Sequence, residues 1–319
     1  MEDDLILKIK DIVPSADANT IVGIGDDTAV INFKDSPKIL ATADMLMEDI
    51  HFRRSWGEFY FLGKKSIAQN ISDIAAMGGI PVSALISIAV PEKITESNIL
   101  EIYRGISDAA REYNITISGG DTIKSSDKLV ISVAMLGSAG DTYPLRGGAK
   151  VGDIVAVTGF LGNASEGLRL LEQGIKFKSA TEIERKLISA QLLPVPRVNA
   201  GRILSAIPVN AMMDISDGIG RDLRRICAMS NVGAVIYEEN IPIDDDLRSI
   251  AEKPLQSAIS GGEDFELLVT IDEEKFEVAK RALLPLKFTA IGKITAEKRM
   301  ILQREYGENI ELYEGFSHF

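Results

Sequence analysis

The sequence has 319 residues, a length that predicts two domains at roughly 100–200 residues per domain. With 35 Lys and Arg against 47 Asp and Glu, the net charge is −12, which disfavours a general nucleic-acid-binding protein because such proteins carry a basic face. One cysteine excludes an intramolecular disulfide and favours the cytoplasm, where we expect the protein. Two histidines and one cysteine are too few for an ordinary Cys/His zinc site.

Apolar runs in this chain are short. The longest strongly apolar stretch, around residues 84–90, is far below the ~18 residues that a membrane span needs. The N-terminus begins Met1-Glu2-Asp3-Asp4, whereas a signal peptide begins with basic residues. We therefore expect neither a membrane span nor a signal peptide.

Helical and strand-like patterns alternate through the first half of the chain. In chain order they predict a short amphipathic helix at 4–12, strands at 29–33 and 38–43, a helix at 58–77, a strand at 82–90, a helix at 95–113, and strands at 115–118 and 129–139. The helix at 58–77 ends at Gly78-Gly79-Ile80-Pro81, a strong helix-stop signal.

The second half continues the alternation after a glycine-rich connection, Arg146-Gly147-Gly148. We place the domain boundary there, with domains at residues 1–145 and 146–319. The pattern beyond it predicts strands at 154–158, 234–237, 266–271 and 288–294, and helices at 164–172, 183–192, 198–205, 218–229 and 273–284.

Acidic residues follow several apolar, strand-like runs directly, often with glycine beside them. The runs lead into Asp26-Asp27, Asp44, Asp121, Asp214 with Asp217, and Glu263-Asp264, and a further acid, Asp73, lies inside the predicted helix 58–77. Any one of these acids could be a turn residue or a helix cap. Several converging carboxylates would instead require a cation, and oxygen ligands without Cys or His favour Mg²⁺ or Mn²⁺. Such a site suits triphosphate chemistry.

Six segments resemble the thiamine-monophosphate kinase family in their order and spacing: 23–30, 42–52, 70–81, 118–122, 213–222 and 260–267. The specific part is the combination of Asn70-x-Ser72-Asp73-x-Ala75-Ala76-Met77-Gly78 with Ser260-Gly261-Gly262-Glu263-Asp264-Phe265-Glu266-Leu267. That family belongs to a superfamily with aminoimidazole-ribonucleotide synthetase, selenophosphate synthetase and a hydrogenase-maturation protein.

The resemblance implies an α/β N-terminal domain, whose sheet pairs with a second copy to form a barrel across a homodimer, and an α+β C-terminal domain beside it. It also implies direct, in-line transfer of phosphate from ATP to thiamine monophosphate with several Mg²⁺ ions. No general base is expected, because a phosphate monoester has a second pKa of ~6 and its oxygens are largely ionised near pH 7.

The resemblance also assigns roles to residues. The expected metal ligands are Asp27, Thr42, Asp44, Asp73, Asp121, Asp214 and Asp217; the expected ATP contacts are Tyr103, Gly120, Asp121, Arg146 and Ser216; and the expected substrate contacts are His51, Glu263 and Tyr313. Ala43, Asp49 and Tyr313 depart from residues frequent in the family, and these departures concern substrate positioning rather than the chemistry.

Two alternatives stay open. One is another ATP-using enzyme of the superfamily, such as an aminoimidazole-ribonucleotide synthetase; a selenophosphate synthetase is disfavoured because no cysteine precedes Cys227. The other is a non-catalytic acidic protein that binds nucleotides or divalent cations.

Overall fold

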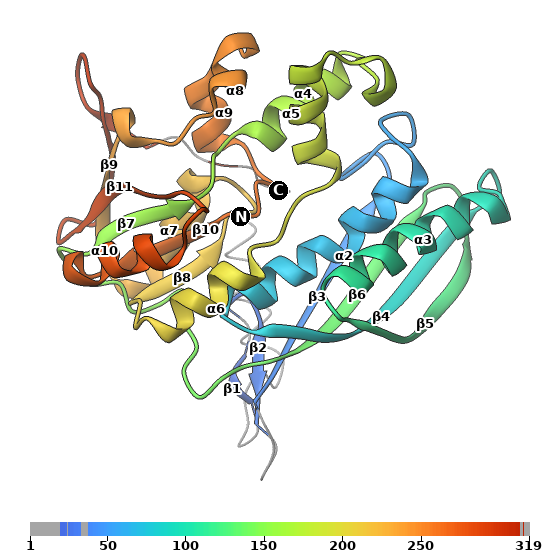
Figure 1. Ribbon diagram of the computed structural model, residues 1–319, viewed down its shortest axis with the longest axis horizontal. Coiled ribbons are helices and arrows are strands. Elements are labelled where there is room, and N and C mark those ends of the chain that lie inside the picture. The colour runs from blue at the N-terminus through green and yellow to red at the C-terminus, as the bar shows by residue number, and fades with distance from the viewer. Residues whose placement is uncertain (1–19, 24, 33–37, 313–314, 316–319) are drawn as a thin grey trace.

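Two mixed β-sheets, each with its own helices, make up the protein (Figure 1). The computed structural model describes residues 20–23, 25–32, 38–312 and 315. The predicted helix at 4–12 and Tyr313 lie outside these residues. No helix in the described part of the chain is long and apolar enough to cross a lipid bilayer.

The first sheet has the strand order β1-β2-β3-β6-β4-β5, in which only β4 and β5 pair in parallel. Its strands are β1 (Thr20–Val22), β2 (Ala29–Ile31), β3 (Ile39–Met47), β4 (Ile80–Pro91), β5 (Thr116–Ser125) and β6 (Val130–Ser138). The parallel pair is joined by α3 (Glu96–Glu112), as a parallel connection requires.

One face of this sheet is covered by α3 and by α2 (Phe59–Ala76), which lie side by side on it (Figure 1). The period of two along β4 buries Ala84, Ile86 and Ile88 beneath the helices. Leu85, between them, points to the opposite face and is 48% exposed. That opposite face is covered by no described helix.

The second sheet has the order β13-β12-β9-β11-β7-β10-β8. Its strands are β7 (Ile154–Thr158), β8 (Ala211–Asp214), β9 (Gly233–Tyr237), β10 (Leu267–Ile271), β11 (Phe288–Thr295), β12 (Met300–Gln303) and β13 (Ile310–Glu311). The helices around it are α4 (Asn163–Glu172), α5 (Glu182–Leu192), α6 (Val198–Ala206), α7 (Ile219–Ser230), α8 (Asp245–Ile250), α9 (Pro254–Ser260) and α10 (Glu273–Ala282), with short 3₁₀ turns at Phe177–Ser179 and Glu238–Asn240.

Helix α2 belongs to the first domain but also packs against α5, α6 and β8 of the second. The approach to α6 is close: a Cβ atom on Gly201 would lie 2.0 Å from the backbone oxygen of Ala75. Side chains on the domain-facing side of α2 therefore meet the second sheet directly, and this helix connects the two halves of the site described below.

The prediction that acids terminate the strands is wrong for Asp44 and Asp121. β3 continues to Met47 and β5 continues to Ser125, so both acids lie inside strands. The physical reason is that a strand with one exposed face tolerates polar residues at alternate positions. The short elements α8, α9, β12 and β13 were not among the predicted helices and strands.

Candidate active site

A cavity of about 530 Å³ lies between the two domains, with walls from both. The first domain contributes Asp44, His51 and Trp56, and the second contributes Ser216, Asp217 and Glu263. Five of these six residues were predicted from the sequence as site residues. The cavity therefore brings together segments more than 200 residues apart in the chain.

Three predicted metal ligands form a compact acidic cluster: Asp27 from the turn before β2, Asp73 from α2 and Asp214 from the end of β8. One carboxylate oxygen of each lies within 4.8 Å of those of the other two. The Thr42 hydroxyl donates to Asp73 Oδ2, and the Ser72 hydroxyl donates to Asp214 Oδ2 at 2.6 Å.

The cluster carries more negative charge than its surroundings compensate. Burial, followed by the charges of Asp44, Asp214 and Asp27, raises the pKa of Asp73 well above its usual value. Burial and then the charge of Asp27 raise the pKa of Asp214 in the same way. Arg146 Nη2 donates to Asp27 Oδ1 at 2.7 Å, yet Asp27 Oδ2 is buried without a hydrogen-bond partner. A buried oxygen without a partner, in an all-oxygen donor set, fits a hard divalent cation.

Asp44 links this cluster to the cavity. It lines the cavity wall, accepts a hydrogen bond from Asn70 Nδ2 at 2.9 Å, and its pKa is raised by burial to about 6. Asp44 and Asp73 are near enough to interact electrostatically.

Asp217 lies on the cavity wall with arginine partners instead of other acids. Its Oδ2 is 2.8 Å from Arg225 Nη1 and 3.8 Å from Arg221 Nε. The backbone N–H groups of Ser216 and Asp217 both donate to Asp222 Oδ2, at 3.1 and 3.0 Å. The segment before α7 is thus fixed, with Ser216 and Asp217 at the cavity surface.

The predicted substrate contacts His51 and Glu263 line the same cavity, from different domains. His51 Nδ1 accepts a hydrogen bond from the backbone N–H of Met47 at 3.0 Å, which orients the imidazole ring. Glu263 Oε1 is 2.8 Å from Lys65 Nζ, and Glu263 Oε2 accepts from Gln191 Nε2 at 2.6 Å.

Other predicted residues do not reach the cavity within one chain. Gly120 and Asp121 lie on the edge strand β5, which is separated from β3 by two strands, β6 and β4. The register Met45–Ser132–Ser87–Asp121 places Asp121 on the uncovered sheet face.

A structural reason explains the glycine at position 120: a Cβ atom there would lie 1.7 Å from the backbone oxygen of Ile86. Tyr103 is half-buried against the core on α3, and Tyr313 lies outside the described residues. The roles of Tyr103, Gly120, Asp121 and Tyr313 stay predictions.

Sequence reasoning missed Lys65, Gln191 and Trp56. Lys65 has a side chain that is only 3% exposed, although lysine side chains are normally solvated. Its position among the buried residues of α2 was the available signal, since a lysine in an apolar helical stretch needs an acidic partner. Gln191 and Trp56 carried no such signal.

Two family models match the chain: AIR synthase related protein, N-terminal domain, over residues 25–139, and AIR synthase related protein, C-terminal domain, over residues 150–305. The thiamine-monophosphate kinase of Bacillus subtilis is 38% identical over 303 residues, covering 93% of each chain. That of Pyrococcus abyssi is 37% identical over 300 residues, covering 92% of this chain and 90% of the relative.

Solved structures give the same result. A structure of AaThiL complexed with AMPPCP and TMP matches with a TM-score of 0.83 and 31% identity, covering 98% of this chain and 96% of that chain. Thiamine monophosphate kinase from Aquifex aeolicus matches with a TM-score of 0.81 and 33% identity, covering 94% and 96%. The likeness extends over both domains, and the protein belongs to the thiamine-monophosphate kinase family.

Proposed function

We propose that this protein transfers the γ-phosphate of ATP directly to thiamine monophosphate, giving thiamine diphosphate and ADP. The observation that carries the proposal is the cavity itself. It connects, through Asp44, a cluster of uncompensated acids to a wall that presents His51 and Glu263. One end is suited to cations and the polyphosphate that they accompany, and the other end presents groups for a smaller acceptor.

Magnesium fits the cluster because the donors are all oxygens and Asp27 Oδ2 has no partner of its own. Asp27, Asp73 and Asp214 would hold the ions, with Thr42, Asp44 and Asp217 as further ligands. Asp121, on the uncovered sheet face, would reach an ion only from a second copy of the chain. Bound Mg²⁺ supplies neutralisation of the charge on phosphate oxygens. The proposal includes more than one ion.

The remaining residues bind and orient the two substrates. Arg146 offers a planar guanidinium to phosphate oxygens, and its position is fixed by its ion pair with Asp27. We assign Ser216, Tyr103 and Gly120 to the binding of ATP. His51, Glu263 and Tyr313 are assigned to the acceptor. No side chain is assigned as a general base, because the attacking phosphate oxygen is already ionised.

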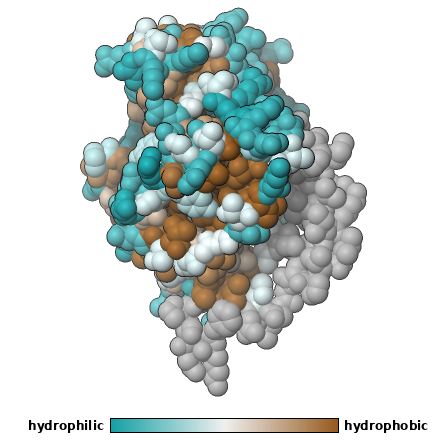
Figure 2. Space-filling view, turned by 90° about the vertical axis from the view of Figure 1, so that its right-hand side faces the viewer, coloured by the Kyte–Doolittle hydropathy of each residue, from teal (hydrophilic) through white to brown (hydrophobic). Residues whose placement is uncertain are grey.

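We infer that the protein acts as a homodimer through the uncovered face of the first sheet. Met45, Leu85, Ile123 and Leu136 are 46–56% exposed on this face, and Asp121 lies among them. Figure 2 shows apolar surface on the side of the molecule that carries the first sheet. Large exposed apolar patches usually mark an interface. Sedimentation should give a dimer, and Leu85→Lys should give a monomer.

A cytoplasmic location is part of the proposal. It is supported by the cysteine content, because a chain with a single cysteine, the buried Cys227, forms no internal disulfide and suits a reducing compartment.

The direct test is to incubate the purified protein with ATP, Mg²⁺ and thiamine monophosphate and to separate the products by chromatography. We expect thiamine diphosphate and ADP in equal amounts, and no product when a chelator replaces Mg²⁺. A parallel reaction with free thiamine should give no product, because the acceptor oxygen must belong to a phosphate. ATP binding without turnover on thiamine monophosphate would contradict the proposal and favour a binding protein.

A further inference from the structure

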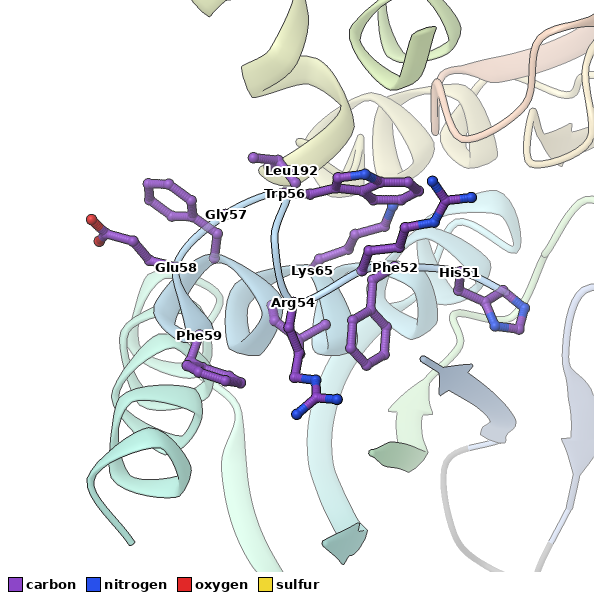
Figure 3. A pocket seen from close by; sticks show the side chains of 12 residues that line it. His51, Phe52, Arg54, Trp56, Gly57, Glu58, Phe59, Lys65 and Leu192 are labelled. Carbon is purple, nitrogen blue, oxygen red and sulfur yellow. The ribbon is translucent and has the colours of Figure 1, made fainter. Parts of the chain in front are cut away.

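Lys65 is a buried lysine at the junction of the two domains. Its side chain, on α2 of the first domain, is 3% exposed, and its Nζ lies 2.8 Å from Glu263 Oε1 of the second domain. Figure 3 shows the side chain extending from α2 toward Trp56, and Lys65, Trp56 and Leu192 line a small cavity. An ammonium group is costly to bury without an anion, so Lys65 depends on Glu263.

Glu263 is fixed from three directions. Lys65 holds one carboxylate oxygen, and Gln191 Nε2 donates to the other at 2.6 Å. The backbone of Glu263 has φ +66°, a left-handed conformation that a non-glycine residue rarely adopts, and its N–H donates to Ser216 O at 2.8 Å. Strained residues of this kind persist only where the surroundings hold them, and they concentrate at functional sites.

Glu263 also faces the substrate cavity. Its side chain is 24% exposed and forms part of the cavity wall. Each carboxylate oxygen can accept more than one hydrogen bond, so the two internal partners leave acceptor capacity free. The cavity also contains Asp44, Asp217 and Glu172. Without its internal cation, Glu263 would be repelled by these acids and could turn away.

We propose that Lys65, together with Gln191, is a positioning residue that fixes Glu263 as the hydrogen-bond acceptor for an N–H donor of the phosphorylated acceptor. The inference rests on the proposed function. Because the partners come from α2 and α5, binding of the acceptor depends on the packing of the two domains and not on Glu263 alone.

The first test is Lys65→Met, with Lys64→Met as the matched control. Lys64 is the neighbouring residue on α2, but its side chain is 29% exposed and pairs with Glu112 at 3.4 Å on the surface. We expect Lys65→Met to raise the KM for thiamine monophosphate by about tenfold or more, because losing a charge-assisted hydrogen bond weakens binding by about this factor. The KM for ATP and kcat should stay within about twofold, and Lys64→Met should match the wild type.

Binding can also be measured without turnover. Trp56 is the single tryptophan of the chain and lines the cavity, so its fluorescence reports acceptor binding in the absence of ATP. The dissociation constant of thiamine monophosphate should rise in Lys65→Met by the same factor as the KM. Gln191→Met removes a neutral donor without leaving a buried charge unpaired, and it should raise the same constant by a smaller factor.

A double variant separates positioning from stability. Lys65→Met and Glu263→Gln should each lower the thermal unfolding temperature, whereas the combination should recover it, because no buried charge remains unpaired. The KM for thiamine monophosphate should stay raised in all three variants. Recovery of a wild-type KM in the double variant would overturn the proposal, and so would equal increases in the KM values for both substrates. Absence of any kinase activity in the wild type would instead refute the proposed function.

Discussion

Two acidic regions near the cavity balance their carboxylates differently. In the cluster beside the cavity, Asp27, Asp73 and Asp214 lie within 4.8 Å of one another with one arginine, Arg146, on Asp27, and mutual repulsion helps to raise the pKa of Asp73 and of Asp214. In the segment that carries Glu263 on the cavity wall and Glu266 outside it, each glutamate has a basic partner of its own: Lys65 pairs with Glu263, and Arg197 pairs with Glu266.

This difference separates acids whose charge is available to a cation from acids whose charge is already neutralised within the protein. Uncompensated buried carboxylates favour either protonation or a cation from solution, so their charge is available to a ligand. A carboxylate with a fixed internal cation is already neutralised, and it contributes shape and hydrogen-bonding direction instead. Both kinds are acidic residues in short motifs of the sequence, and their partners in the fold distinguish them.

The largest effect should follow from Asp214→Asn. We expect kcat to fall by about 1000-fold, equivalent to ~4 kcal/mol, because the substitution removes a group that fixes charge at the site of transfer. The free energy of unfolding of the metal-free protein should increase, because one of three repelling carboxylates is gone. Steady-state rates and thermal unfolding in chelator, without and then with Mg²⁺, measure both.

The control is Asp127→Asn, which changes an exposed acid that pairs with Lys128 on the surface. It should leave both quantities unchanged, since exposed ion pairs contribute little. An Asp214→Asn variant that keeps activity within a few-fold of wild type would show that the cluster does not hold the catalytic metal.

Arg197→Met should act on stability and not on chemistry. Arg197 Nε donates to Glu266 Oε2 at 2.7 Å, and the same oxygen accepts from the Thr158 hydroxyl at 2.6 Å. Removing the guanidinium leaves Glu266 buried without its cation, at a cost of about 3 kcal/mol in the free energy of unfolding. Denaturant titration measures the loss, and Arg197→Met/Glu266→Gln should recover most of it. A large fall in kcat for the folded fraction would contradict this assignment.

The sequence patterns left open whether Asp27, Asp73 and Asp214 converge, and the family resemblance was what grouped them as metal ligands. Each lies in a short motif whose local structure is strong: a glycine-rich turn, an amphipathic helix with a clear stop, and an apolar strand before a helix. The sequence predicted a strand just before Asp121 but not its continuation to Ser125, because polar residues at alternate positions weaken the apolar pattern of a half-exposed strand.

The positioning contacts were not predictable in the same way. Lys65 and Glu263 are far apart in the chain, and their ion pair exists only because α2 packs against the second domain. Gln191 lies at the end of a predicted helix, and no sequence pattern indicates which neighbour its side-chain amide contacts. Long-range pairs of this kind depend on domain packing, which periodicity and motif spacing do not describe.

Asp264 lies between the two kinds of acid, and its effect should depend on pH. Its carboxylate accepts backbone N–H bonds from Gly162 at 2.8 Å and Ala164 at 3.3 Å, but burial outweighs these donors and raises its pKa to about 8. An acid with a raised pKa in the folded state stabilises the protein fully below pH ~4, and this contribution is lost as the pH rises through ~8.

Asp264→Asn should remove that dependence, because the amide is neutral throughout. Between pH 5 and pH 7, the free energy of unfolding of the wild type should fall, relative to the variant, by up to ~1.4 kcal/mol per pH unit, the value for one proton. Denaturant titrations of both proteins in chelator measure the difference. Parallel pH profiles would mean that the two N–H donors keep Asp264 ionised, and the acid would then belong with Glu263 and Glu266 as a fully compensated carboxylate.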